Sequence, residues 1–348
     1  MAAGPRCAIS SDGHVICTFI VQSKLGINDF VPMQSRSRDG GLTWEEAQPI
    51  WPNLAHDFSI FCSVSGSPSG ELFLYGIQIP IDQRGETFWS NATQGMKDNQ
   101  LFWARSTDSG RSWTEPVTIP KPISGSAEAP GPMCVTGSGR WLTCYAPYNT
   151  FDPAVIIERN QVVLLASDNQ GQSWWHTRML QFEEVSSGAA EAWVVELADR
   201  SLLGTCWQVS YEEGVEYPNP YTISWDGGNT WTPARSTGIL GQSTGLAALP
   251  DGRALLVYNQ RKHGEPGVWL AVSRPTKLDF GLESNRIIWR AERATQHSSS
   301  AEHNEWEDFA FGEPSATVLP DRSILVTLWC VQPSGQGIRY VKLRLEDT

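Results

Sequence analysis

SRDGGLTW, residues 37–44, contains a pattern, Ser-x-Asp-x-Gly-x-x-Trp, that recurs along the chain. The further copies are STDSGRSW (106–113), SDNQGQSW (167–174), where Asn169 replaces the aspartate, and SWDGGNTW (224–231). The aspartate carboxylate can accept hydrogen bonds from turn amides, and glycine adopts a left-handed backbone without steric cost. Each copy therefore predicts a tight turn followed by a tryptophan that packs between strands, and the repetition indicates a repeat architecture.

A second pattern consists of two short apolar runs joined by a two-residue turn, which is a β-hairpin signal. The six turns begin at Asp12, Ser69, Ser138, Asp199, Asp251 and Asp321. A Ser-x-Asp turn follows each of the first four hairpins, so each unit is expected to hold four antiparallel strands. Six such units predict an all-β, six-bladed β-propeller that occupies residues 1–348 as one domain. The final run, IRYVKLRLED, supplies only a third strand, so the sequence leaves the closure of the ring open.

The composition excludes several classes of function. The net charge is −12 and no basic run occurs, which argues against nucleic-acid binding. No apolar stretch approaches the ~18 residues of a membrane span, and MAAGPRCAIS lacks a signal-peptide pattern. The chain is therefore expected to be cytoplasmic, or secreted with its signal removed. The oligomeric state stays open.

The residues that bind metals and cofactors show no recognisable spacing. The seven cysteines have no CxxC pair and lie in strand-like runs, so they are expected to be buried free thiols. Cys7 and Cys17 flank the first hairpin turn and are expected to face each other. The six histidines form no HxxxH pair, and no phosphate loop occurs. Neither a metal nor a cofactor is predicted.

The repeated turns resemble the Asp boxes, or BNR repeats, of the sialidase (neuraminidase) superfamily, and the six hairpin units resemble its six-bladed propeller. The resemblance covers essentially the whole chain. Asp boxes are specific for the fold, but they also occur in propellers that are not enzymes. Because the boxes lie around the outside of one rim, a functional site is expected on the opposite rim, where the innermost strands begin.

Counting eight residues back from each hairpin turn marks the start of each innermost strand. The six positions are Gly4, Phe61, Pro130, Glu191, Ser243 and Glu313. A carboxylate at the mouth of an apolar strand is costly to desolvate and needs a reason. The structural reason would be a rim carboxylate paired with an arginine. The functional reason would be a carboxylate pair facing one channel, as glycoside hydrolysis commonly requires, with Glu191 as general acid/base and Glu313 as nucleophile.

The same resemblance also shows departures from true sialidases. Glu191 stands where it places the superfamily's site glutamate, but Glu313 stands where sialidases carry a tyrosine nucleophile. A glutamate ~4 Å from the carboxylate of sialic acid would cost on the order of 4 kcal/mol at an effective dielectric constant of 20. The three-arginine clamp for that carboxylate is incomplete, because Arg6 is three positions off and only Arg261 matches clearly. The pattern is more similar to the exo-arabinanases of the superfamily, which use two glutamates on neutral sugars.

Further site candidates come from the loops between the second and third strands of each unit. Asp29 lies where the resemblance places an acid/base aspartate. Aromatic and polar side chains suited to a sugar pocket are Tyr148, Trp207, Gln208, Tyr258, Asn259 and His263, with Arg6 and Arg261 as cations and His56 and Asp57 before the second unit.

The sequence therefore predicts an exo-acting glycoside hydrolase that removes a terminal sugar from a glycan. Three alternatives stay open. One is a true exo-α-sialidase with a degenerate arginine clamp. Another is a polysaccharide lyase in which His263 beside Arg261 acts as the base. The last is a propeller without catalytic activity that binds a glycan or a protein.

Overall fold

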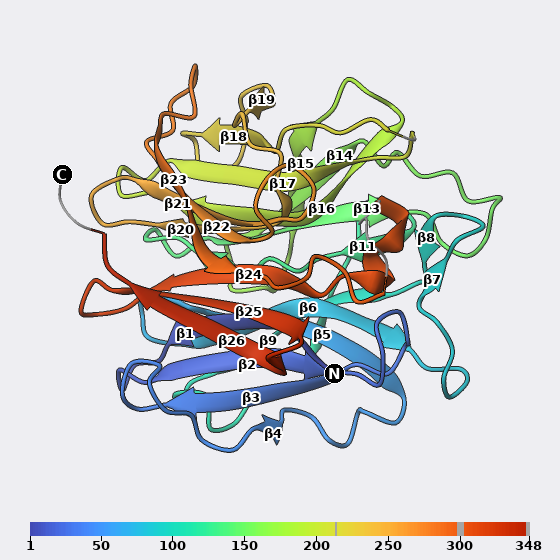
Figure 1. Cartoon of the computed structure of the whole chain (residues 1–348), viewed down its shortest axis with the longest axis horizontal. Helices are drawn as coiled ribbons and strands as arrows, with labels where there is room; N and C mark the ends of the chain where they lie inside the picture. The colour runs from blue at the N-terminus through green and yellow to red at the C-terminus, as the bar shows by residue number, and fades with distance from the viewer. Residues whose placement is uncertain (213, 298–302, 346–348) are drawn as a thin grey trace.

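The computed structural model of the chain describes residues 1–212, 214–297 and 303–345. Six antiparallel sheets follow one another along the chain and form the blades of a propeller (Figure 1). Within the described residues the one helix is a short 3-10 turn, η1 (His303–Asp308). The structure confirms the all-β, six-bladed propeller expected from the hairpins and tight turns.

The strands follow the expected order from the inside of each blade to the outside. The first blade contains β1 (Ala2–Ile9), β2 (Val15–Val21), β3 (Val31–Ser37) and β4 (Gln48–Pro49). The second contains β5 (Phe58–Gly66), β6 (Leu72–Pro80), β9 (Gln100–Ser106) and β10 (Val117–Ile119). The third contains β11 (Ser126–Glu128), β12 (Cys134–Val135), β13 (Trp141–Tyr148), β14 (Gln161–Ser167) and β15 (Trp175–Gln181). The inner strand of the third blade is thus divided into two pieces, β11 and β12, which both pair with β13. A small hairpin of β7 (Trp89–Ser90) and β8 (Gly95–Met96) is inserted in the second blade.

The other three blades repeat this arrangement with one difference. The fourth blade contains β16 (Ser187–Glu196), β17 (Leu202–Ser210), β18 (Pro220–Ser224) and β19 (Arg235–Ser236). The fifth contains β20 (Gln242–Ala248), β21 (Ala254–Gln260), β22 (Gly267–Ser273) and β23 (Leu282–Arg290). The sixth contains β24 (Phe311–Val318), β25 (Ile324–Gln332) and β26 (Gly335–Leu343). The sixth blade has three strands in the described residues, as the end of the sequence indicated.

The ring closes because the sixth blade packs against the first. Figure 1 shows β24 to β26 beside β1 and β2, and β1 contacts β24 and β25. Side-chain hydrogen bonds tie the two blades together: Ser315 Oγ donates to Pro5 O at 2.8 Å and Tyr340 Oη donates to Leu42 O at 3.1 Å.

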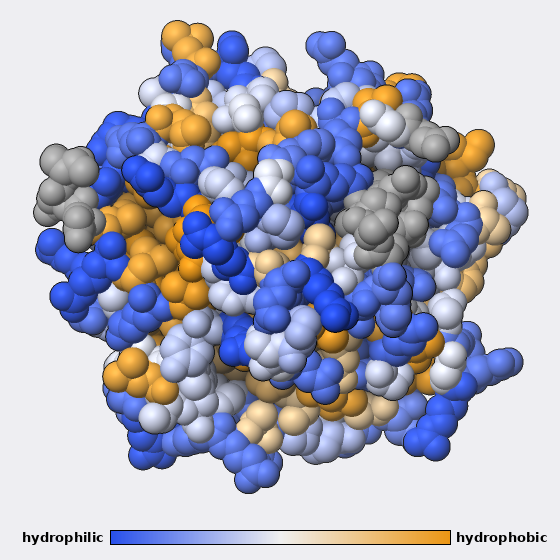
Figure 2. All heavy atoms as spheres, viewed as in Figure 1, coloured by the Kyte–Doolittle hydropathy of each residue, from blue (hydrophilic) through white to orange (hydrophobic). Residues whose placement is uncertain are grey.

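The core lies between the faces of neighbouring blades. Because each sheet has another sheet on both sides, the middle strands are buried along their whole length, as in β14 and β21. Large aromatic side chains fill the gap between the second and third blades, where Trp141 lies edge-on to Phe73 (4.7 Å between ring centroids) and Trp103 (5.0 Å). The face of the molecule in Figure 2 is largely hydrophilic.

The four Ser-x-Asp turns share one hydrogen-bond pattern. In the first, Asp39 Oδ1 accepts the amides of Leu42 (3.0 Å) and Thr43 (2.8 Å), and Ser37 Oγ accepts the amide of Gly41 (2.8 Å). Gly41 has a φ of 89°, a backbone that glycine adopts without strain. In the third turn Asn169 Oδ1 takes the place of the carboxylate and accepts the amide of Ser173 at 2.9 Å.

These turns lie on the same rim as the hairpin turns of neighbouring blades. Ser11 Oγ in the first hairpin turn is 2.9 Å from Ser109 Oγ in the second Ser-x-Asp turn. Arg140, next to the third hairpin turn, donates to Gly227 O in the fourth Ser-x-Asp turn at 2.7 Å. The opposite rim, where the innermost strands begin, is therefore separate from the repeated turns, as the sequence predicted.

The cysteines also follow the prediction, since all seven are free thiols, five of them buried and two partly buried. Cys7 and Cys17 are cross-strand partners in β1 and β2. None of the described helical segments is long and apolar enough to cross a membrane.

Candidate functional site

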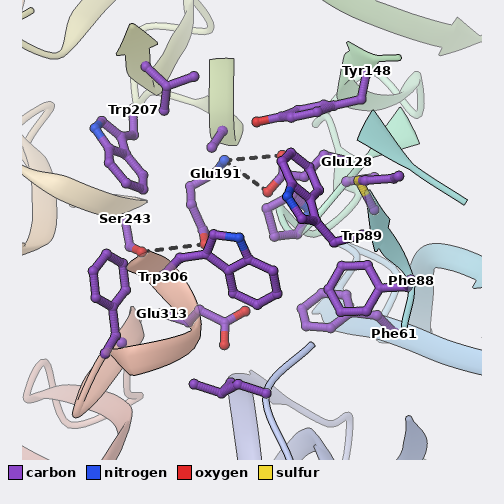
Figure 3. Close-up of a pocket in the computed structure, with 18 of the residues that line it drawn as sticks. Phe61, Phe88, Trp89, Glu128, Tyr148, Glu191, Trp207, Ser243, Trp306 and Glu313 are labelled. Carbon is purple, nitrogen blue, oxygen red and sulfur yellow. Dashed lines mark hydrogen bonds between the residues drawn. The ribbon is translucent and has the colours of Figure 1, made fainter. Parts of the chain in front are cut away.

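A cavity of about 240 Å³ opens on the rim opposite the Ser-x-Asp turns, near the lower size limit of small-molecule sites, about 300 Å³. Its wall is formed by residues from all six blades and from the β7–β8 hairpin and the η1 segment (Figure 3). The polar groups on the wall include the carboxyls of Glu128, Glu191 and Glu313 and the guanidinium of Arg261.

The two glutamates found by counting eight residues occupy distorted backbone positions. Glu191 has a φ of 54° and Glu313 a φ of 48°, in the left-handed region that costs a non-glycine residue about 1–3 kcal/mol. Both lie in β-bulges. The strand register shifts between Ala190 and Trp193 and between Gly312 and Ser315, so two residues of the inner strand face one residue of the next. Such bulges re-aim side chains, and here both carboxyls line the cavity.

The backbone of Glu191 is held by side chains from both neighbouring blades. Its N–H donates to both carboxyl oxygens of Glu128, at 3.1 Å each, and its carbonyl accepts a hydrogen bond from Thr244 Oγ1 at 2.9 Å. The Glu191 side chain is nearly buried, and Oε1 lies 3.4 Å from Ser243 Oγ, the donor on the fifth blade (Figure 3). The blades around Glu191 therefore fix its position.

Arg6 lies beneath the cavity at the centre of the propeller and is 1% exposed. Its Nη2 is 3.6 Å from Glu191 Oε2, and its Nη1 donates to the Glu313 carbonyl at 3.0 Å. Its Nε donates to Pro130 O at 3.2 Å. Arg6 is therefore a buried counter-ion of the carboxyl cluster and is absent from the cavity wall.

Burial dominates the electrostatics of the three carboxyls. It raises the pKa of Glu191 to about 8, with the Glu313 carboxyl adding to the rise and Arg6 opposing it. Burial likewise raises the pKa of Glu313 and, together with the charge of Glu191, places the pKa of Glu128 well above its ordinary range. The cluster therefore holds a carboxyl proton near neutral pH, as a general acid requires.

Arg261 is the one cationic side chain on the cavity wall among the described residues. It is stacked on the ring of Phe309 at 3.8 Å, donates through Nη2 to Phe311 O, and lies 3.4 Å from Gln242 Oε1 through Nη1. Burial lowers its pKa to about 9. Two of its three nitrogen atoms are thus engaged with protein oxygens.

Aromatic rings form much of the rest of the cavity wall. Trp306 of η1 lies over Phe88 (5.5 Å between centroids) and edge-on to Trp89 (6.2 Å), and Trp89 is edge-on to Tyr148 (5.9 Å). These contacts join the β7–β8 hairpin to η1, which lie next to each other at the right of Figure 1. Phe61 and Trp207 complete the aromatic wall (Figure 3).

The structure brings several predicted site residues to the cavity and leaves others elsewhere. Those on the wall are Glu191, Glu313, Arg261, Tyr148 and Trp207, with Arg6 beneath them. Asp29 is outside the cavity wall, where its carboxylate accepts the Ser23 amide (3.2 and 3.3 Å) and caps a loop. His56 and Asp57 pair with each other at 3.0 Å on the surface.

The other candidates outside the cavity wall belong to strand interiors or to another cluster. Tyr258 lies inside β21, and its Oη donates to Asn285. Asn259, also in β21, is fully buried. His263 contacts Glu216, and Gln208 contacts Glu184 and Ser187 beside a separate small cavity. The loop that was expected to carry Tyr258 and Asn259 begins later, because β21 extends to Gln260.

Sequence reasoning missed Glu128 and the aromatic residues of the two insertions. Glu128 is two residues before Pro130, the position counted in the third unit, and the division of that inner strand into β11 and β12 shifts the channel-facing position. Phe88, Trp89 and Trp306 lie in segments that follow no repeat. The sequence signal for these residues was the presence of aromatic side chains in connections that are otherwise polar.

Comparisons with known proteins agree with this architecture. Residues 62–307 match the model of the BNR repeat-like domain. A sialidase of Bacteroides fragilis is 24% identical over 225 residues, which cover 58% of this chain and 37% of that protein. The chain thus matches little more than a third of that relative's length.

Two solved structures are similar over almost the whole chain. A protein of unknown function from Dyadobacter fermentans has a TM-score of 0.77 at 20% identity, covering 99% of this chain and 95% of the other. A Hadza microbial sialidase has a TM-score of 0.69 at 18% identity, covering 99% of this chain and 66% of the other. At these sequence identities, the structural similarity shows that this chain shares their fold.

Fold and repeats together define a six-bladed propeller of the sialidase superfamily. The match covers well over half of the sequence, so the chain belongs to the BNR repeat-like domain family.

Proposed function

We propose that this protein is an exo-acting glycoside hydrolase whose catalytic pair is Glu191 and Glu313. The observation that carries the proposal is that two glutamates on equivalent left-handed bulges of the fourth and sixth blades line one aromatic cavity above a shared arginine. A pair of carboxyls flanking the bond to be broken is the usual requirement for glycoside hydrolysis. The likeness to a Bacteroides fragilis protein named as a sialidase supports a glycan as the substrate.

The roles follow from the electrostatics. Glu191, whose pKa is about 8, donates its proton to the glycosidic oxygen as the bond to the leaving group breaks. Glu313 attacks the anomeric carbon through a carboxylate oxygen and forms a glycosyl ester. Water then attacks this ester, Glu191 takes the proton of the water, and the Glu313 carboxylate is released with the free sugar.

The charges on the cavity wall favour a sugar without a carboxylate. An anionic sugar would face the Glu313 carboxylate, the nucleophile of the proposed mechanism, and Arg261 already donates to Phe311 O and contacts Gln242. Arg6 donates to carbonyl oxygens and contacts Glu191 beneath the wall. Binding a carboxylate needs donors that are free to turn toward it. A neutral terminal sugar is therefore the preferred substrate, and the sialic acid of true sialidases is the less favoured one.

A lyase reaction through His263 has less support, because its ring contacts Glu216 and is absent from the cavity wall. A propeller that binds glycans without cleaving them is the alternative that the experiments must exclude.

A panel of aryl glycosides tests the proposal directly. The purified chain is expected to release aryl alcohol from a neutral glycoside, such as an arabinosyl or rhamnosyl one, and to leave sialyl and glucuronyl glycosides intact. Proton NMR of the first-formed product would show retained anomeric configuration if Glu313 is the nucleophile.

Variants of the two glutamates test the assignment of roles. Glu191→Gln and Glu313→Gln are expected to lower turnover by about 100-fold to 10,000-fold while ligand binding persists. Glu216→Gln is a suitable control because Glu216 is outside the main cavity wall, in contact with Lys262 and His263. Ligand binding without turnover on any glycoside would instead identify a binding propeller.

A further inference from the structure

Glu128 occupies an unusual place beside Glu191. The bulge removes Glu191 from the ladder between β16 and β17, so its buried N–H needs another acceptor. Both carboxyl oxygens of Glu128, on β11 of the preceding blade, accept this N–H at 3.1 Å (Figure 3). With Thr244 Oγ1 bound to the carbonyl, both backbone polar groups of Glu191 are held by side chains of other blades.

These contacts stabilise a conformation that the chain would otherwise avoid. A non-glycine residue keeps a left-handed backbone only where its surroundings over-determine it. Without the Glu128 acceptor the buried Glu191 N–H would be unsatisfied, and relaxation toward an extended backbone would turn the carboxyl away from its present direction.

Packing alone does not account for a carboxyl at this position. Glu128 lies in the same cavity wall as Glu191 and Glu313, and like charges placed together disfavour one another. Burying a third carboxyl here is costly, and both of its oxygens are engaged with the Glu191 amide.

We propose that Glu128 is a positioning residue, which fixes the left-handed backbone of Glu191 and thereby aims its carboxyl into the cavity that Glu313 also lines. The consequence for catalysis rests on the proposed function. The consequence for the Glu191 backbone can be tested separately.

Glu196 offers a matched control for Glu128. Its Oε2 accepts the N–H of Gly137 at 2.8 Å, so it also joins the third and fourth blades through a carboxyl–amide hydrogen bond. Glu196 lies beside the hairpin turns, on the opposite rim, and is absent from the main cavity wall.

The kinetic test compares Glu128→Ala, Glu128→Gln and Glu196→Ala on the best glycoside. Glu128→Ala is expected to lower kcat by about 100-fold with little change in KM, because misplacing a reacting group by about 1 Å has an effect of that size. Glu128→Gln keeps one acceptor oxygen, so its kcat should be at least about tenfold higher than that of Glu128→Ala. This is roughly half of the expected loss on a logarithmic scale. Turnover of Glu128→Ala within about threefold of Glu196→Ala, with both proteins folded, would overturn the proposal.

A second measurement is independent of enzymatic activity. Hydrogen exchange of the Glu191 amide, followed by NMR, should accelerate by at least about 100-fold in Glu128→Ala and stay unchanged in Glu196→Ala. An unchanged Glu191 amide would overturn the positioning role even if the protein is an active hydrolase. Accelerated exchange in a chain inactive on every glycoside would support the role of Glu128 in holding the backbone, while the proposed hydrolase function would fail.

Discussion

Arg6 in the first blade and Glu191 in the fourth meet at the centre of the propeller, with 3.6 Å between Nη2 and Oε2. The remaining donors of Arg6 reach carbonyl oxygens of Pro5, Pro130 and Glu313. One buried cation thus connects the inner strands of four blades and lies beneath the carboxyl cluster. The arginine that resembled a displaced part of a substrate clamp contacts the protein's own glutamate.

Arg6→Ala is expected to reduce stability strongly. Removing the guanidinium leaves the buried carbonyl oxygens of Pro130 and Glu313 without this donor, and each unsatisfied buried group lowers the free energy of unfolding by about 1–3 kcal/mol. Urea denaturation would measure the change. Arg111→Ala, which removes the more exposed contact with Asp12 at 3.0 Å, should change it by less than about 1 kcal/mol. Equal effects of the two substitutions would contradict a special role for Arg6.

The stability of the carboxyl cluster should fall as the pH rises. The folded-state pKa of Glu191 is about 8, above its ordinary value of 4.5, so folding favours the protonated form. This contribution is complete below pH 4.5 and is lost as the pH rises through about 8. The unfolding free energy of the wild type relative to Glu191→Gln should therefore decrease over this window, by at most about 1.4 kcal/mol per pH unit for one proton.

Denaturant titrations of both proteins across that window would measure the difference. A difference that does not vary with pH would show that Glu191 ionises normally. If Glu191 donates the proton in catalysis, kcat should fall over the same upper range of pH, because the acid form is lost.

The residues differ in how far the sequence could place them. Glu191 and Glu313 were accessible because hairpin turns are local signals and each blade repeats the distance from strand start to turn. Glu128 was not, because the third inner strand is interrupted and the count fails there. Trp306 was not, because its contact with Trp89 joins insertions of the sixth and second blades, and no local pattern encodes that pairing. Arg6 was found as a candidate, but its partner depends on the geometry of the whole ring.

The Ser-x-Asp turns should affect stability and leave the site unaffected. Asp108 Oδ1 accepts the amides of Arg111 (3.0 Å) and Ser112 (2.9 Å). Asp108→Ala removes these hydrogen bonds and should lower the unfolding free energy by roughly 1–3 kcal/mol. Asp108→Asn should have a smaller effect, because Asn169 makes the equivalent contact in the third turn. Both variants should bind glycan ligands as the wild type does, and a loss of binding that exceeds the loss of folded protein would contradict this separation.

The aromatic wall should control ligand affinity more than turnover. Trp306 lies over Phe88 and beside Trp89 on the cavity wall. Trp306→Ala removes a large apolar surface that a sugar ring can contact, so the Kd of a bound glycoside should rise by about tenfold, equivalent to about 1.4 kcal/mol. Isothermal titration calorimetry would give the Kd, and kcat at saturating substrate should stay within about threefold of the wild type, since the interaction is made in the ground state and the transition state alike.

Trp225→Ala is the matched control, because Trp225 is an exposed tryptophan of the fourth Ser-x-Asp turn on the opposite rim. A Kd unchanged by Trp306→Ala, or raised equally by both substitutions, would show that the sugar does not contact this wall.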